Sequence, residues 1–331
     1  MNYPFKNLVF SGGGVLGIAY LGSLGYLYRT QLIHSIINVA GTSTGAITAC
    51  LVSFNPTFKE LDSMLKTLDY HKIPQKDEAS DTPRIIPQVI KDQFGKVLDN
   101  FDCVYRLIKN FGWYSSQYFY DWIKLQIASQ FDPLKKEPPY TFSDFKDSSL
   151  HKNQRLFKDL YIIGTDISKS TSSIFSYETT PNMEVAEAVR ISMSVPLLFE
   201  SISSSCNANL TESNGLYVDG GLLYNYPINL FDTKYPLNAT LGIYFKSTSM
   251  PRPINNLVDF ISSALSCSSI IQNALFESNP QNMARSICIQ TGDISAFDFN
   301  ISYNDSTYQF LYQQGYRAAE IYFSLLKSRS I

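Results

Sequence analysis

The amino-acid sequence predicts an α/β fold with a mainly parallel central sheet. Two short apolar runs, at residues 6–10 and 36–40, each lead through a glycine-containing turn into a segment whose apolar residues have helical spacing. Repeated strand–turn–helix units build parallel sheets, because each helix carries the chain back to the edge where the next strand begins. At 331 residues the chain is long enough to bury a substantial core.

The remaining elements follow from hydrophobic periodicity and from polar, proline-bearing stretches. We expect helices over residues 15–27, 44–52, 61–68, 97–109, 116–129, 184–192 and 308–327. Strands are expected over residues 157–165, 174–178, 196–202, 215–218, 240–245 and 286–290, and loops over 74–87, 132–139 and 207–214. The last helix is predicted to pack on the sheet, because one of its faces carries Leu311, Gly315, Ala318, Tyr322 and Leu325.

The second turn has the pattern G-x-S-x-G, running from Gly41 to Gly45 with Ser43 at its centre. At the junction of a strand and a helix this pattern is typical of a nucleophile elbow, in which the serine hydroxyl is lifted out of the sheet. The alternative is that Ser43 is an ordinary helix N-cap, a position that serine favours. The motif alone leaves these two interpretations about even.

A serine nucleophile needs a general base, and the histidines limit the choice. The chain holds His34, His71 and His151, and because none follows residue 151 a late catalytic histidine is excluded. We expect His71 and His151 to lie in solvated loops. Asp219 ends a strand-like run before two glycines, where it could take the proton from Ser43 directly. A simple turn is the alternative.

Two other features compete with this interpretation. Asp166 also follows a strand-like run, but it lacks the glycine pair, and we expect a turn or capping role for it. Gly12, Gly14 and Gly17 fit G-x-G-x-x-G, the dinucleotide fingerprint, which needs an acidic residue about 20 residues further on. No Asp or Glu occurs before Glu60. We therefore expect no dinucleotide cofactor, and an oxyanion loop is favoured here over a purely structural glycine turn.

Three signatures, taken in order along the chain, carry a resemblance to a known family. The stretches 12–17, 41–45 and 219–221 resemble the glycine loop, the serine elbow and the Asp-Gly-Gly motif of the patatin-like phospholipases. Residues 188–199, which end in a proline-containing strand, and Asn225-Tyr226-Pro227 are similar to two further family segments. The resemblance covers about residues 6–231.

The resemblance implies a three-layer α/β/α fold and a Ser–Asp dyad. Ser43 would be the nucleophile and Asp219 the general base, with an oxyanion hole at Gly12, Gly13 and Gly14. The supporting motif positions would be Gly17, Gly41, Gly45, Gly220 and Gly221. No metal and no organic cofactor is implied.

The resemblance further implies that a phospholipid or another lipid ester is the substrate, through phospholipase A or lysophospholipase activity. Neutral glycerolipid hydrolysis is the near alternative. The family's glycine loop usually carries Arg or Lys where this chain has Leu16. That departure keeps open a third alternative, an inactive lipid-binding or partner-regulating module.

Composition sets the remaining expectations. The net charge is −2 and no basic stripe is present, which argues against nucleic-acid binding. Five cysteines without regular spacing favour reduced thiols and a cytoplasmic protein. The lipid substrate that the resemblance implies adds peripheral membrane association to this expectation. The uncharged stretch 7–28 is too rich in glycine for a membrane span, and we expect neither a span nor a signal peptide. An unidentified protein activator remains open.

We expect one domain over residues 1–331, with the motif-bearing core at about 6–231 and C-terminal strands and a helix at 232–331. The long insertion at about 54–157 is predicted to form a helical cap beside Ser43. Both tryptophans, Trp113 and Trp122, lie in an aromatic cluster of this insertion, which favours either a lid or helix packing in the core, with core packing slightly ahead.

Overall fold

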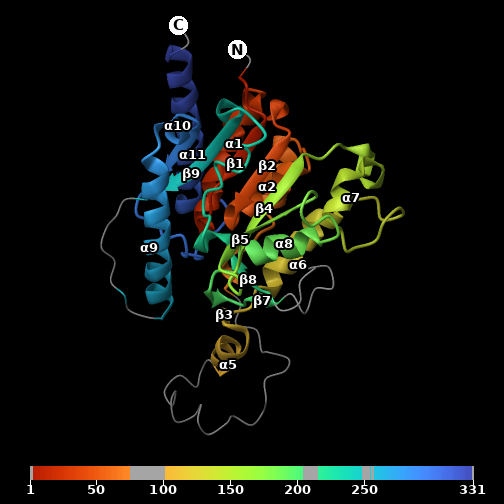
Figure 1. Ribbon diagram of the computed structural model, residues 1–331, viewed down its shortest axis with the longest axis vertical. Coiled ribbons are helices and arrows are strands. Elements are labelled where there is room, and N and C mark those ends of the chain that lie inside the picture. Colours follow the sequence, from red (N-terminus) through yellow and green to blue (C-terminus); the bar gives the residue numbers. More distant parts are fainter. Residues whose placement is uncertain (1–2, 75–100, 204–214, 248–253, 255–256, 330–331) are drawn as a thin grey trace.

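An eight-stranded sheet forms the centre of the computed structural model, which describes residues 3–74, 101–203, 215–247, 254 and 257–329 (Figure 1). Its strands are β1 (Asn7–Phe10), β2 (Asn38–Thr42), β4 (Asp159–Asp166), β5 (Thr171–Ser176), β7 (Ile202–Ser203), β8 (Leu216–Asp219), β9 (Thr240–Lys246) and β10 (Ser286–Gln290). A separate two-stranded sheet pairs β3 (Gly112–Tyr114) with β6 (Leu197–Phe199).

The strand order is β10-β9-β1-β2-β4-β8-β7, with β5 paired to β4 off this path. The strands from β10 to β4 are parallel neighbours, whereas β5 and β8 both run antiparallel to β4. The predicted α/β fold with a mainly parallel sheet is therefore confirmed.

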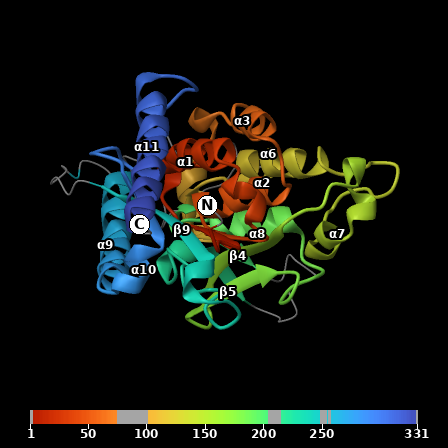
Figure 2. The same ribbon diagram turned by 90° about the horizontal axis from the view of Figure 1, so that it is seen from above.

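The helices are α1 (Ile18–Arg29), α2 (Thr44–Ser53), α3 (Phe58–Leu65), α5 (Phe101–Asn110), α6 (Gln117–Ala128), α7 (Phe142–Lys146), α8 (Val185–Ser192), α9 (Leu257–Glu277), α10 (Pro280–Ala284) and α11 (Ser306–Arg329). Alternate strand residues bury themselves on opposite faces of the sheet, because side chains alternate along a strand. Leu8 and Phe10 join the main core with α1, α2, α8 and α11, whereas Val9 packs in a second core with Phe276 of α9. The sheet thus lies between two layers, as Figure 2 shows from above.

Most predicted elements are present within a few residues of their expected bounds. The 21-residue helix α9 is the main omission, because the sequence analysis predicted no element there. In α11 the predicted inner face is correct at Leu311 and Gly315, but Leu325 is 54% exposed. The predicted loop at 207–214 and most of that at 74–87 lie outside the described residues.

The aromatic cluster of the insertion packs mainly into the core. The Trp122 side chain is 5% exposed and its indole N–H donates to Thr67 Oγ1 at 2.9 Å, so core packing explains this residue. Trp113 is half-buried. No helix in the described part of the chain is long and apolar enough to cross a membrane.

Helices α1 and α11 touch backbone to backbone, because glycine lies at each contact point. A Cβ atom added at Gly315 would lie 1.8 Å from the carbonyl oxygen of Ala19, and one added at Gly22 would lie 1.9 Å from that of Tyr312. Ser23 Oγ also donates to the Gly315 carbonyl at 2.7 Å. Together these contacts fix the position of α11 against the sheet.

We predict that Gly315→Ala lowers the free energy of unfolding by ~1–3 kcal/mol or more, because the added methyl group forces the two helices apart. This loss should appear although alanine favours a helix over glycine by ~1 kcal/mol. Urea unfolding followed by circular dichroism measures it. Gln313→Ala, on the exposed face of the same helix, is the control and should change little. Equal midpoints for both variants would contradict the close contact.

Candidate active site

Strands β2 and β8 approach each other end to end along one edge of β4. Thr42, the last residue of β2, pairs with Ile163 of β4, and Asp219, the last residue of β8, pairs with the adjacent Gly164. Strand β5 occupies the opposite edge of β4 over the same residues. Since β2 runs parallel and β8 antiparallel to β4, their carboxyl ends meet, and Ser43 is brought beside Asp219.

Ser43 lies on a strained turn between β2 and α2. Its φ and ψ angles of 54° and −123° are rare for a residue with a side chain. The flanking glycines are required by space, because a Cβ at Gly41 would lie 2.1 Å from the Gly45 carbonyl oxygen, and one at Gly45 would lie 2.5 Å from that of Phe10. Ser43 occupies the N-cap position of α2, but its side chain makes no capping bond to the helix.

Ser192, at the end of α8, supports this turn. The Ser43 amide donates to Ser192 Oγ at 2.9 Å, and Ser192 Oγ donates to the Ile163 carbonyl at 2.5 Å. One hydroxyl thereby connects the serine elbow to the β4 residue that pairs with Thr42. These hydrogen bonds help to hold Ser43 in its strained backbone conformation.

The Asp219 carboxylate is almost completely buried beside Ser43. Its Oδ1 accepts a hydrogen bond from the Gly221 amide at 2.5 Å, and the neighbouring Ser43 hydroxyl favours the charged form of the carboxyl. Burial raises the pKa of Asp219 to about 7, because the charged form is poorly solvated, although the Ser43 hydroxyl and the Gly221 amide both oppose this shift. A carboxylate with a pKa near neutrality suits general-base chemistry.

The first glycine loop passes over the same site. A Cβ at Gly14, whose φ is +54°, would lie 2.0 Å from the Ala296 carbonyl oxygen, and one at Gly13 would lie 2.4 Å from the Phe245 ring. The Gly12 amide donates to the Asn225 carbonyl at 3.0 Å. Among the backbone bonds of the described residues the Gly13 and Gly14 amides donate to no carbonyl, so these two N–H groups are available to a ligand.

The remaining motif glycines permit close packing. A Cβ at Gly17 would lie 2.0 Å from Thr44 Oγ1, and one at Gly220 would lie 2.4 Å from the Ile163 carbonyl oxygen. At Gly221 the nearest atom, Asn225 Oδ1, would be 2.9 Å away. Gly17 thus brings the glycine loop against the serine elbow, whereas Gly220 and Gly221 lie close to β4 and to Asn225.

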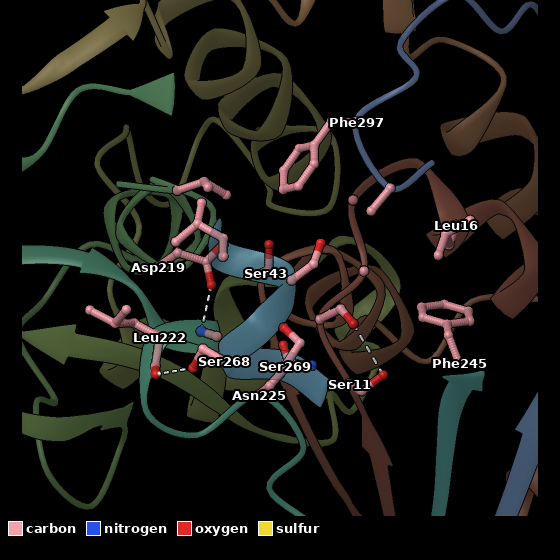
Figure 3. Close-up of a pocket in the computed structure, with 18 of the residues that line it drawn as sticks. Ser11, Leu16, Ser43, Asp219, Leu222, Asn225, Phe245, Ser268, Ser269 and Phe297 are labelled. Atoms are coloured by element: carbon pink, nitrogen blue, oxygen red, sulfur yellow. Dashed lines mark hydrogen bonds between the residues drawn. The ribbon is translucent and has the colours of Figure 1, made fainter. Parts of the chain in front are cut away.

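Ser43 and Asp219 open into a cavity of about 210 Å³ (Figure 3). The glycine loop, Leu16, Phe245 and Phe297 form part of its wall. No Lys or Arg lies among the described residues that line it, and the Leu16 side chain occupies the wall where the family usually has a cation. A second, apolar chamber adjoins the cavity and shares Ser43, Gly14, Val195 and Phe297 with it.

Helix α9, which the sequence analysis did not predict, supplies another wall of the cavity. Gln272 Nε2 donates to the carbonyls of Gly221 and Leu222 at 3.0 and 3.2 Å, and its Oε1 accepts from the Asn225 amide at 2.8 Å. Ser268 Oγ also donates to the Leu222 carbonyl at 3.2 Å. The helix thus holds the loop that follows Asp219. No local pattern marks Gln272, since its partners are distant in sequence.

The histidines and Asp166 have structural roles. His71 is exposed, as expected, but the prediction of a solvated His151 is wrong: it is 1% exposed, and its ring nitrogens contact the Arg155 and Asp144 carbonyl oxygens at 2.7 and 3.0 Å. Asp166 accepts from the Lys169 amide at 3.2 Å, which confirms a turn role. In the described part of the chain no group of three or more His, Cys, Asp or Glu could hold a metal ion.

The chain belongs to the patatin-like phospholipase family, whose model matches residues 8–232. Among its relatives, uncharacterized protein R571 of Acanthamoeba polyphaga mimivirus is 27% identical and covers 92% of this chain and 90% of that protein. The probable lipid hydrolase 463L of Invertebrate iridescent virus 6 is 26% identical over 68% of this chain and 63% of that protein. Family and relatives support lipid hydrolysis as the class of activity.

Solved structures share the fold. VipD from Legionella pneumophila superposes with a TM-score of 0.60 at 19% identity, over 97% of this chain and 67% of that chain. ExoU of Pseudomonas aeruginosa, in complex with SpcU, has a TM-score of 0.50 at 17% identity. This chain spans 53% of the length of that protein. At these identities the likeness concerns the fold alone.

We predict that Asp219→Asn gains stability relative to the wild type as the pH rises from about 4 to about 7. The carboxyl has a pKa of about 7 when folded and 3.8 as its ordinary value. Between these values the folded wild type holds a proton that the unfolded chain has lost, so the wild type loses stability as pH rises through this window.

The asparagine variant cannot ionise, and its advantage in unfolding free energy should therefore grow with pH. Urea titrations at several pH values measure the difference. Asp121→Asn, which alters an exposed carboxylate on α6, is the control. A pH-independent difference at position 219 would show that burial does not hold this carboxyl protonated.

Proposed function

We propose that the chain is a lipid acyl hydrolase of the phospholipase A or lysophospholipase type, working through a Ser43–Asp219 dyad. One observation carries the proposal: a serine hydroxyl on a strained elbow lies beside a buried carboxylate, and both side chains line one cavity. Family membership supports the ester-cleaving chemistry.

In the first step, Ser43 Oγ attacks the ester carbonyl carbon while the Asp219 carboxylate accepts the hydroxyl proton. The tetrahedral intermediate collapses by breaking the bond from carbon to the alcohol oxygen, and Asp219 returns the proton to that oxygen. Water then attacks the acyl-enzyme by the same route and releases a fatty acid. The alcohol leaves in the first half of the reaction, and Ser43 and Asp219 end in their starting forms, so atoms and charge balance.

The oxyanion of each intermediate needs donors that are already aligned. The amides of Gly13 and Gly14 supply them in this proposal, whereas Gly12 is assigned a structural role because its amide is bonded to Asn225. Of the three glycines expected at the oxyanion hole, the proposal therefore keeps Gly13 and Gly14 as donors. Leu16 leaves the negative charge to be stabilised by backbone dipoles.

The two adjoining cavities suggest how a lipid ester is held. The second chamber is lined by apolar side chains such as Leu21, Ile47 and Phe119, and it begins at Ser43. An acyl chain placed there would leave the alcohol part in the more polar cavity, beside Ser268 and Ser269. This arrangement accommodates a phospholipid and equally a neutral glycerolipid, which is the second candidate substrate.

Membrane contact, cellular location, activation and the cap also belong to the proposed function. We propose peripheral contact with a lipid surface, while a cytoplasmic location, a protein activator and a cap formed by residues 54–157 stay predictions. An inactive lipid-binding module on the same fold is the competing function. Fatty-acid release from mixed vesicles, read by mass spectrometry, separates phospholipase, glycerolipid lipase and inactive module.

We predict that Ser43→Ala and Asp219→Asn each lower the rate of ester hydrolysis by ~10²–10⁴-fold or more, because each removes one half of the dyad. A fluorophosphonate probe should label Ser43 in the wild type and leave Ser43→Ala unlabelled. Asp166→Asn, which alters a buried carboxylate outside the cavity, serves as the control for activity. Undiminished turnover by either dyad variant would refute the mechanism.

We predict that Ile47→Phe shortens the preferred acyl chain, because the larger ring fills the apolar chamber next to Ser43. Rates for long-chain esters should fall by about tenfold, whereas those for a butyrate ester should stay within about twofold, as expected for a few methylene groups of lost contact. Ile47→Val, which enlarges the chamber, is the matched control. A uniform loss across chain lengths would place the acyl chain elsewhere.

A further inference from the structure

Helix α9 has its polar and apolar faces reversed relative to an ordinary surface helix. Its inner face carries Ser268, Ser269, Gln272 and Asn273, which line the cavity or bind the loop behind Asp219. Its outer face presents large apolar side chains that are more than half exposed: Phe260 (59%), Ile270 (58%), Ile271 (62%) and Leu275 (70%).

The outer face of α9 is continuous and uncharged. Phe260, Ala264, Cys267, Ile271 and Leu275 follow one another at spacings of three or four residues, which places them in one stripe along a helix. All five are exposed. No charged residue occurs between Asp259 and Glu277. The stripe therefore cannot form ion pairs, and it exposes a large apolar area to solvent.

The helix is nevertheless held firmly against the protein. Ile261 near its start is 3% exposed and Phe276 near its end is 8% exposed. The Phe276 ring packs at 4.8 Å from the rings of both Tyr226 and Tyr244. The outward apolar face is therefore a property of the docked helix.

The apolar surface extends to the mouth of the cavity. Ile270 is 58% exposed and also lines the cavity, so it belongs to both surfaces. Leu223, which is 45% exposed, follows the cavity residue Leu222 directly in the loop that α9 holds. A surface that covers α9 would thus reach the opening above Ser43.

We propose that the outer face of α9 docks the protein on a lipid surface, with the cavity mouth turned toward that surface. This inference rests on the proposed function, because a lipid ester must leave an aggregate to reach Ser43. A lipid surface fits better than a charged protein partner, since the stripe is uncharged. Because the apolar contact requires no anionic lipid, zwitterionic lipid suffices and salt has little influence.

The test uses the full chain and vesicles of pure phosphatidylcholine. The double variant Ile271→Asp/Leu275→Asp should reduce vesicle binding in a flotation assay by a factor on the order of 10–100, because two apolar side chains no longer enter the lipid. Binding of the wild type should be equal at low and high salt. Neither residue lines the cavity, so hydrolysis of a short soluble ester should not change.

A matched control is Leu134→Asp, which alters a 95% exposed leucine in the loop between α6 and α7. Figure 1 places α7 on the opposite flank of the molecule from α9. The variant Ile271→Gln/Leu275→Gln repeats the test with helix-forming residues, in case two new charges disturb folding. Vesicle binding should fall with both α9 variants and remain unchanged with Leu134→Asp.

Two results would overturn the docking proposal. One is vesicle binding that is equal in the wild type and in both α9 double variants. The other is a dimeric wild type and a monomeric α9 variant in light scattering, with vesicle binding unaffected, which would make the stripe a contact between two copies. A wild type that binds vesicles through α9 but cleaves no ester would refute the proposed function and leave the docking proposal intact.

Discussion

The arrangement of the site depends on one edge of strand β4. Strand β2 occupies the first part of that edge and β8 the last part, and their ends meet at Ile163 and Gly164. Because the two strands arrive from opposite directions, the residues that follow them are brought together without a long loop. Ser192, bonded to both the Ser43 amide and the Ile163 carbonyl, fixes the elbow at this junction.

The next layer of contacts joins parts of the chain that are far apart in sequence. The Gly12 amide binds the Asn225 carbonyl, and the Asn225 amide binds Gln272 of α9. The glycine loop, the segment after Asp219 and helix α9 thereby form one continuous support. This explains why the C-terminal part of the chain, which carries no motif, still contributes to the geometry around Asp219.

The two sides of α9 differ in their exposure to water. Toward the cavity, burial removes water from Asp219 and raises the pKa of that carboxyl, which costs stability at neutral pH but suits a base that takes a proton from serine. Toward solvent the helix leaves Ile271 and Leu275 unburied. The exposed stripe keeps apolar surface in contact with water, and the proposed docking would cover it.

The sequence by itself determined the local geometry. Gly41, Gly45 and Gly14 mark positions where a side chain would strike nearby backbone, and such constraints are visible in short motifs. The strands and most helices were predictable from hydrophobic periodicity, which is also a local feature of the sequence. Only the tertiary structure decided that the Gly12 amide is bonded to Asn225, that His151 is buried, and that α9 forms one wall of the cavity. These depend on contacts between residues distant in sequence. In α9, Ser268 and Ser269 line the cavity while Ile271 and Leu275 are exposed, which hides the usual amphipathic signal.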